Sequence, residues 1–169
     1  MKKSILFCLL FVFTTNCMSQ TKQALMDYLT QNAKYLNPIE GVYDVEWYCR
    51  WITPFVDKTY GTYNATFIIV KNTEGSYNVY HSSGYGVGAN EFEIASNINI
   101  RQLGETNVYN FTYYTSKCRI YLTDNNTHFI AKMELDNKSA RKLVTWMNLA
   151  PSVRIYPVYD CIKTYPTPR

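Results

Sequence analysis

The sequence predicts an all-β protein: an antiparallel up-and-down β-barrel of about eight strands, preceded by one short helix. After residue 40, apolar and polar residues alternate with a period of two, and polar turns separate the alternating runs at spacings of roughly 10–15 residues. No helical segment lies between these runs, so neighbouring strands can all pair antiparallel. Closure into a barrel removes exposed sheet edges, which favours a barrel over the alternative, a β-sandwich.

Length and composition fit one globular domain. The chain has 169 residues, of which 47% are hydrophobic and 18% charged, and this balance excludes a disordered polypeptide. The formal net charge of +4 comes from 17 basic and 13 acidic residues that are scattered along the chain. We therefore expect no nucleic-acid partner, because such a protein would show a basic cluster.

The first 19 residues have the pattern of a signal peptide. Lys2-Lys3 is a short positive region, and residues 4–13 form an apolar run that is too short to span a bilayer as a helix. Cleavage after Ser19 would leave residues 20–169 as a single domain, whereas lipidation of Cys17 would anchor it. We expect an exported protein, periplasmic or secreted, that contacts a membrane only if Cys17 carries a lipid.

Three cysteines remain in the expected mature domain: Cys49, Cys118 and Cys161. Any two of them could pair in an oxidising compartment, and the sequence does not choose between the pairings. Cys161 lies among prolines near the C-terminus, where a disulfide to a strand would fix the tail. The alternative is that all three are reduced and buried as small apolar side chains.

The period of apolar residues is helical from Thr21 to Leu36. The apolar stripe consists of Leu25, Leu29, Ala33 and Leu36. Pro38 pushes Asn37 out of the α region and ends the helix. We expect this segment to be a short lid or plug for the barrel.

Alternation then predicts eight strands. The first is Tyr43–Trp51, and the next two, Tyr63–Lys71 and Tyr77–His81, form a hairpin around the turn at residues 73–76. Five further runs follow, at residues 92–100, 109–113, 118–122, 129–135 and 140–149. Residues 153–159 would add a ninth extended segment.

Two segments of the chain carry a family resemblance. Asn37-Pro38-Ile39-Glu40-Gly41-Val42-Tyr43 opens the first long strand after the helix, and Ile162-Lys163-Thr164-Tyr165-Pro166 closes the chain. With the strand meander between them, they resemble the lipocalin-like (calycin) barrels of exported bacterial proteins over about residues 22–166. Gly41-Val42-Tyr43 stands where lipocalins carry Gly-x-Trp, with Tyr in the Trp place.

The resemblance implies a role for Tyr43 and for the barrel interior. Tyr43 would pack across the closed end of the barrel, capped by a basic residue from the last strand, for which the candidates are Arg141, Lys142 and Arg154. The resemblance also implies a small hydrophobic or amphipathic ligand inside the barrel.

The inward faces of the predicted strands carry many aromatic residues. Each ring buries ~150–250 Å², so the rings alone could fill much of an eight-stranded barrel. We therefore expect a narrow pocket at one open end, with Tyr85 at the tip of a glycine-rich connection over the mouth. The expected ligand-binding residues are Trp47, Trp51, Phe67, Tyr85, Tyr109, Phe111, Tyr113 and Phe129.

Patterns for catalysis or metal binding are weak. His81 and His128 are the only histidines, and His81 and its neighbour Ser82 would point to opposite faces of a strand. The sequence contains no nucleophile elbow and no spacing typical of a metal site. We therefore expect no enzyme activity, no catalytic residues, and no metal or other cofactor, although a small hydrolase using His81 and Asp160 is an alternative.

The leading hypothesis is an exported, monomeric, non-enzymatic protein that binds a small hydrophobic or amphipathic molecule in its barrel. The alternative is an envelope protein-interaction or structural module whose barrel is filled by aromatic residues. Tyrosine is enriched at interfaces, so outward tyrosines would favour this alternative. The candidates are Tyr48, Tyr80, Tyr114 and Tyr121.

Overall fold

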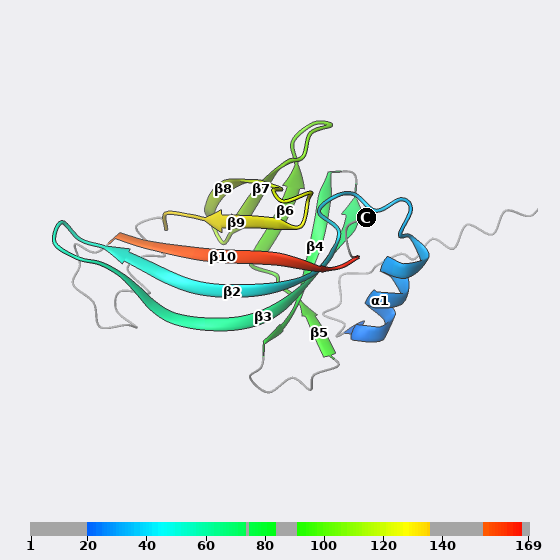
Figure 1. Ribbon diagram of the computed structural model, residues 1–169, viewed down its shortest axis with the longest axis horizontal. Coiled ribbons are helices and arrows are strands. Elements are labelled where there is room, and N and C mark those ends of the chain that lie inside the picture. The colour runs from blue at the N-terminus through cyan, green and yellow to red at the C-terminus, as the bar shows by residue number, and fades with distance from the viewer. Residues whose placement is uncertain (1–19, 74, 84–90, 136–153, 167–169) are drawn as a thin grey trace, which may run out of the picture.

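The computed structural model describes residues 20–73, 75–83, 91–135 and 154–166 (Figure 1). The predicted signal peptide, Tyr85 and the predicted strand at residues 140–149 lie outside these ranges.

An antiparallel β-barrel dominates the described chain. The strands are β1 (Gln20–Thr21), β2 (Gly41–Ile52), β3 (Asp57–Thr73), β4 (Ser76–Ser83), β5 (Glu91–Ile94), β6 (Ile98–Gln102), β7 (Val108–Tyr113), β8 (Ser116–Tyr121), β9 (His128–Lys132) and β10 (Arg154–Tyr165). Eight of them pair in the order β8-β7-β6-β4-β3-β2-β10-β9, and β5 pairs with β4 and β1 off this path. Since β8 and β9 also lie next to each other, the ring is nearly closed (Figure 1). The predicted all-β barrel with one short helix is confirmed.

The alternating run at residues 92–100 is two strands rather than one. Between β5 and β6, the N–H of Ala95 donates to the carbonyl of Val79 over 2.8 Å, and the N–H of Ile98 donates to the carbonyl of Ala95 over 2.9 Å. The second bond closes a tight turn, which redirects the chain from one strand to the next. Alternation continues across this turn, so the break was invisible in the sequence.

Strand β10 is the element that completes the ring. It pairs with β2 from Arg154 to Tyr165 and with β9 from Val158 to Ile162. The expected proline-flanked tail around Cys161 is therefore the middle of a long strand, with Cys161 fully buried. Two strands, rather than a disulfide, hold this segment in place.

Helix α1 (Lys22–Gln31) packs on the outside of the barrel. The Oγ1 of Thr21 caps its first turn by accepting the N–H of Ala24 over 3.2 Å. The helix ends before the predicted Leu36, because the backbone and side-chain N–H groups of Asn32 both donate to the carbonyl of Tyr28.

The buried face of α1 covers side chains that point out of the barrel, next in sequence to side chains that point into it. Leu25 and Leu29 pack in a cluster with Val42, Ile68 and Tyr80. The expectation of a lid or plug is therefore wrong, because the helix covers the outer face of the sheet. This position also buries Tyr80, which is only 1% exposed and cannot serve as an outward tyrosine for a partner.

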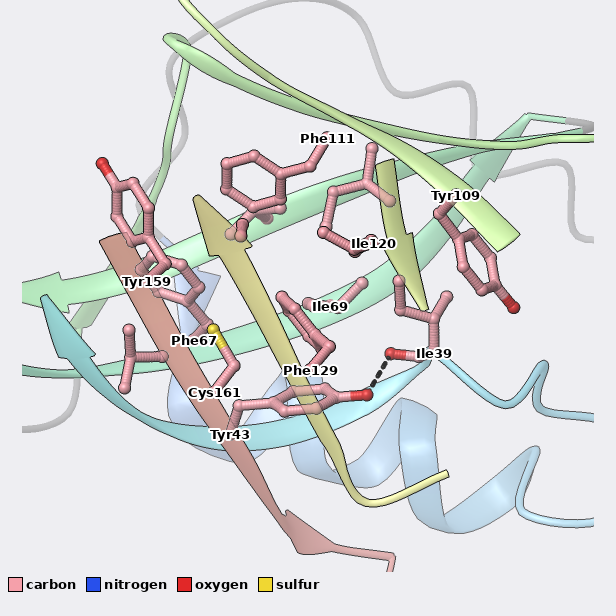
Figure 2. Close-up of a cluster of buried hydrophobic side chains, with 14 of the residues drawn as sticks. Ile39, Tyr43, Phe67, Ile69, Tyr109, Phe111, Ile120, Phe129, Tyr159 and Cys161 are labelled. Carbon is pink, nitrogen blue, oxygen red and sulfur yellow. Dashed lines mark hydrogen bonds between the residues drawn. The ribbon is translucent and has the colours of Figure 1, made fainter. Parts of the chain in front are cut away.

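The barrel interior holds a packed aromatic core (Figure 2). Tyr43 and Phe129 meet edge to face with ring centroids 5.2 Å apart. The ring of Tyr159 lies 5.4 Å from that of Phe111 and 5.9 Å from that of Phe67. Such contacts add ~0.5–1.5 kcal/mol per pair to the free energy of burial.

Tyr43 and Lys163 close one end of the barrel. The hydroxyl of Tyr43 donates to the carbonyl of Ile39 over 2.9 Å. The Nζ of Lys163 lies 5.4 Å from the centroid of the Tyr43 ring and donates to the carbonyl of Pro38. Burial lowers the pKa of Lys163 to about 8, with the charge of Glu40 acting in the opposite direction.

The basic residue over Tyr43 is thus Lys163, which was not among the three candidates expected from the resemblance. Arg154 lies at the opposite end of β10 and is exposed, while Arg141 and Lys142 lie outside the described residues. The close approach of β10 also explains why residue 41 is glycine. A Cβ at Gly41 would collide with the carbonyl oxygen of Tyr165, and φ there is +151°.

Glu40 organises the chain beside this closed end. Its carboxylate is 2% exposed and accepts the backbone N–H groups of Asn37 and Lys71 over 2.8 and 2.9 Å. It also accepts the hydroxyl of Tyr28 over 3.3 Å. Burial, together with this carboxylate, raises the pKa of Tyr28 to about 12. These bonds connect α1, the segment before β2, and β3.

Candidate functional site

A cavity of about 480 Å³ lies in the barrel, further along β2 than the closed end at Tyr43. Five rings line it: Trp47, Tyr63, Phe67, Tyr113 and Tyr159. The polar residues at its wall are Thr62, Asn64, His81 and Asn97. Thr62 and Asn64 alternate with the inward Tyr63 and Ala65, so their side chains point to the outer face of β3. Val45, Ala65, Ala95 and Ile98 complete the lining.

The cavity lies where the inward positions of the strands carry small side chains instead of aromatic ones. The strand register places Ala65 of β3 opposite Val45 of β2, between the Tyr43–Phe67 pair and the Trp47–Tyr63 pair. Ala95 lies at the turn between β5 and β6. Nearer the closed end, large rings fill the interior, so the open volume is confined to one part of the barrel.

The rings around the cavity pack against one another. Trp47 and Tyr63 have centroids 5.2 Å apart with their planes tilted by 35°, and Tyr113 and Tyr159 meet edge to face at 5.7 Å. Burial raises the pKa of Tyr113 and that of Tyr159, which also contact each other, so both stay neutral phenols. The described lining contains no carboxylate, ammonium or guanidinium group. Such a wall suits an uncharged or amphipathic molecule.

One polar atom at this wall lacks a partner. The Nε1 of Trp47 is buried and has no hydrogen-bond acceptor among the described residues. Buried indole N–H groups ordinarily find an acceptor, because an unmet donor costs ~1–3 kcal/mol. A bound molecule carrying an acceptor could remove this cost.

The seven described residues that were predicted to bind the ligand fall into three groups. Trp47, Phe67 and Tyr113 line the cavity. Tyr109, Phe111 and Phe129 are fully buried in the packed core. Trp51 lies beyond the cavity on β2, in a small cluster with Cys49, Leu135 and Ile155. Tyr85 lies outside the described residues.

Other lining residues did not emerge from the sequence. Tyr159 lies two residues before the buried Cys161, so both side chains point to the same face of β10. The sequence would have indicated this if the strand had been predicted to continue past Tyr159. Tyr63 and His81 depend on register: Tyr63 lies opposite Trp47, and His81 lies opposite Phe67. Their positions follow from pairing between strands, which single-strand alternation does not reveal.

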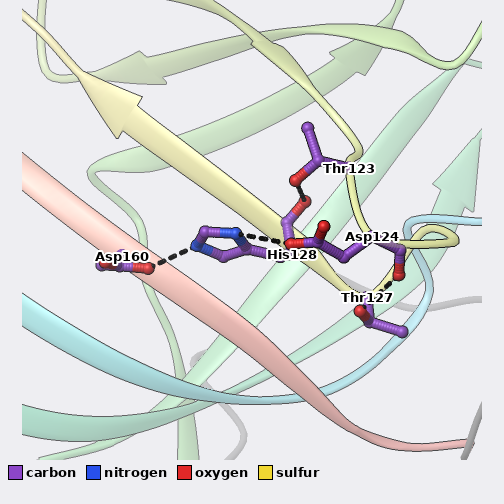
Figure 3. A network of polar contacts seen from close by, with 5 residues as sticks. All are labelled: Thr123, Asp124, Thr127, His128 and Asp160. Atoms are coloured by element: carbon purple, nitrogen blue, oxygen red, sulfur yellow. Dashed lines mark hydrogen bonds and ion pairs between the residues drawn. The ribbon is translucent and has the colours of Figure 1, made fainter.

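His128 forms a separate polar network (Figure 3). Its Nε2 lies 2.7 Å from Oδ1 of Asp160 on β10, and its Nδ1 lies 3.3 Å from Oδ2 of Asp124 in the turn before β9. Carboxylates thus contact both ring nitrogens, so neither is left to activate a nucleophile. Asp160 contacts His128 rather than lining the cavity with His81, which removes the geometry expected for the hydrolase alternative.

All three described cysteines are free thiols. None of the disulfides open to the sequence is formed, and the structure instead has Cys49 and Cys161 buried in its core. Burial raises the pKa of Cys49 and that of Cys118 to about 11, and it also raises the pKa of Cys161. These thiols act as small apolar side chains.

No family model, curated protein or solved structure matches this chain. Within the described ranges, no helix has the length and apolar character needed to cross a bilayer. In the same ranges, no three His, Cys, Asp or Glu side chains gather where they could hold a metal ion. The case for function therefore depends on the cavity itself.

Proposed function

We propose that this protein is a non-enzymatic binding protein that holds a small hydrophobic or amphipathic molecule in the barrel cavity. The supporting observation is an uncharged cavity of about 480 Å³ inside an otherwise filled barrel. This volume lies within the ~300–1,000 Å³ range typical of small-molecule sites. The resemblance to lipocalin-like barrels leads to the same class of ligand.

The ligand's orientation follows from the chemistry of the wall. Its apolar part would lie against Phe67 and Tyr159, since these rings border the packed core. A polar group would face His81 or Asn97, and an acceptor near Trp47 would satisfy the indole N–H. An amphipathic ligand therefore fits the wall better than a pure hydrocarbon.

A fluorescence titration tests this proposal. The full chain is titrated with N-phenyl-naphthylamine, an uncharged apolar dye, and indole emission is followed. We expect saturable binding that changes the emission of Trp47. Replacing Trp47 by Phe should remove most of this change, whereas the matched variant Trp51→Phe should keep it. Equal changes in both variants, or no saturable binding, would contradict the proposal.

A second pair of variants tests the location of the site. Ala65→Leu fills the cavity and should weaken dye binding by about tenfold or more. Thr66→Leu places the same leucine side chain at the next residue, whose side chain lies on the other face of β3, and should leave affinity unchanged. Equal affinity in Ala65→Leu and the unmodified protein would place the dye elsewhere.

Export and lipid attachment are part of the same proposal. We infer that residues 1–19 are removed, or that Cys17 is lipidated. The intact mass of the protein from a bacterial host distinguishes these outcomes, because cleavage gives a chain beginning at Gln20, while a lipid adds mass to Cys17. A full-length, unmodified chain would contradict both.

The alternative interaction module has support of its own. Tyr114 and Tyr121 are 62% and 55% exposed, the first in the turn between β7 and β8 and the second at the far end of β8. Cross-linking in the native host, with Tyr114→Ser and Tyr121→Ser as the comparison, tests it. A partner recovered by the unmodified chain and lost in the double variant would favour this module, and recovery of no partner would count against it.

A further inference from the structure

An exposed apolar tip ends the β2–β3 hairpin. In the turn between the two strands, Phe55 is 94% exposed and Val56 is 42% exposed, directly after Pro54. Figure 1 shows the hairpin extending beyond the adjacent end of β10, as the outermost part of the described chain on that side. An aromatic ring at such a position is not buried and so contributes no hydrophobic stabilisation to the fold.

The turn holds Phe55 outward through its own hydrogen bonds. The N–H of Thr53 donates to the carbonyl of Val56 over 2.8 Å, and the Oγ1 of Thr53 accepts the N–H groups of Val56 and Phe55 over 2.9 and 3.2 Å. Behind the turn, Arg50 and Asp57 form a two-point ion pair, with Nε 2.8 Å from Oδ1. The exposed ring therefore belongs to an ordered turn.

The charges behind the tip are mainly basic. Arg50 is neutralised by Asp57, and two further basic residues, Lys58 and Arg154, lie opposite Trp51 and Ile52 at the tip end of β2. Among the described residues, neither Lys58 nor Arg154 forms an ion pair. Further along the outer face lie the carboxylates of Asp44, Glu46 and Asp160. On β2, β3 and β10, the basic residues without an ion pair therefore lie nearer the tip than these carboxylates.

We propose that this hairpin tip inserts into the surface of an anionic lipid membrane. Phe55 and Val56 enter the boundary between headgroups and acyl chains, while Lys58 and Arg154 contact lipid phosphates. The acidic part of the outer face is repelled by the same surface and orients the barrel with its hairpin toward the lipid. This inference is independent of the cavity and of Cys17.

The size of the tip favours a membrane over a protein partner. One ring buries ~150–250 Å², far below the ~800 Å² that each partner contributes to a standard protein interface. A single convex ring gains most from a deformable apolar phase, which closes around it without a preformed pocket. Basic residues beside the ring complement lipid phosphates specifically when the bilayer is anionic.

Vesicle sedimentation tests the inference. The full chain is mixed with vesicles of phosphatidylcholine alone or of phosphatidylcholine with phosphatidylglycerol. We expect binding to the mixed vesicles that weakens at high salt, and little binding to phosphatidylcholine alone. Phe55→Ser should lower the partition coefficient roughly tenfold, and so should the double variant Lys58→Gln, Arg154→Gln.

The matched control is Tyr35→Ser, which removes another exposed ring (84% exposed) from the far side of the fold and should not change binding. Phe55→Trp gives a second readout, since its added indole emission should shift to the blue with mixed vesicles. No binding of the unmodified chain, or equal binding by Phe55→Ser, would overturn the inference. A tip that contacts a protein would also give no vesicle binding.

Discussion

At the scale of single residues, the most informative side chain is Lys163. It combines a buried amine, a hydrogen bond to Pro38 and a position over the Tyr43 ring. It was not assigned from the sequence, because the predicted extended segment ended at Tyr159, whereas β10 continues to Tyr165. Burial of an amine costs free energy whenever the amine is charged, so the closed end of the barrel should respond to pH.

Lys163 should make stability rise as pH increases above about 8. Its pKa is about 8 in the folded chain and 10.5 when unperturbed, so between these values the unfolded state binds more protons. The free energy of unfolding should therefore gain roughly 1 kcal/mol from pH 8 to 9. Urea unfolding of the protein and of Lys163→Met at both pH values measures this gain as a difference between the two chains.

The comparison with Lys163→Met also removes the effect of the buried thiols. Their raised pKa values act in the opposite direction, with stability lost above about pH 9, and they are common to both chains. Parallel stability curves for the two proteins from pH 7 to 9 would show that Lys163 does not carry the pH dependence.

At the scale of elements, α1 depends on the outer face of the barrel for its stability. A ten-residue helix is marginal on its own in water, so the burial of Leu25 and Leu29 must hold it in place. The polar contacts around Glu40 then fix the segment that leads into β2.

Replacing Leu29 by Ala should lower the free energy of unfolding by about 2–4 kcal/mol, because the side chain is fully buried and its removal leaves a void against Ile68 and Tyr80. Tyr35→Ala, which removes an exposed side chain, should change it by less than ~0.5 kcal/mol. Urea unfolding measures both. A loss below ~1 kcal/mol for Leu29→Ala would mean that the helix docks loosely.

Alternation along the sequence predicted where the strands lie, but it did not predict which residues of different strands become neighbours. Alternation in β2, β7 and β9 is a property of neighbouring residues, so their inward faces could be identified from the sequence. The cavity depends instead on register, since Trp47 and Tyr63 become neighbours only through the pairing of β2 with β3. The docking of α1 on the outer face is likewise a property of the whole sheet, which explains why the expected lid was wrong.

At the scale of the whole molecule, the barrel has one weak seam. Strand β8 pairs only with β7, and β9 only with β10, so no ladder of described backbone bonds joins β8 to β9. Across this seam, the backbone of Lys132 hydrogen-bonds to the Cys118 side chain. Charged residues such as Lys117 and Arg119 lie along the edge and discourage pairing with another chain.

Hydrogen exchange should reveal the seam. Amides of β2 and β3, which are paired on both sides, should exchange most slowly, near the rate set by global unfolding. Amides of β8 and β9 that face the seam should exchange faster, because they have no backbone acceptor among the described residues. Native-state exchange followed by NMR or mass spectrometry measures the difference. Equal protection in all four strands would indicate a continuous ladder.

The pairing of β10 with β2 determines when, during synthesis, the barrel can close. Strand β2 is the first long strand to be synthesised, but β10, which forms one of its two neighbours, follows all the other described strands. The ring therefore cannot close before β10 has left the ribosome, and its long-range contacts are expected to make folding slow after that point. For a chain that we propose to be exported, this delay would keep the polypeptide unfolded, and so able to pass through an export channel, until it has crossed the membrane.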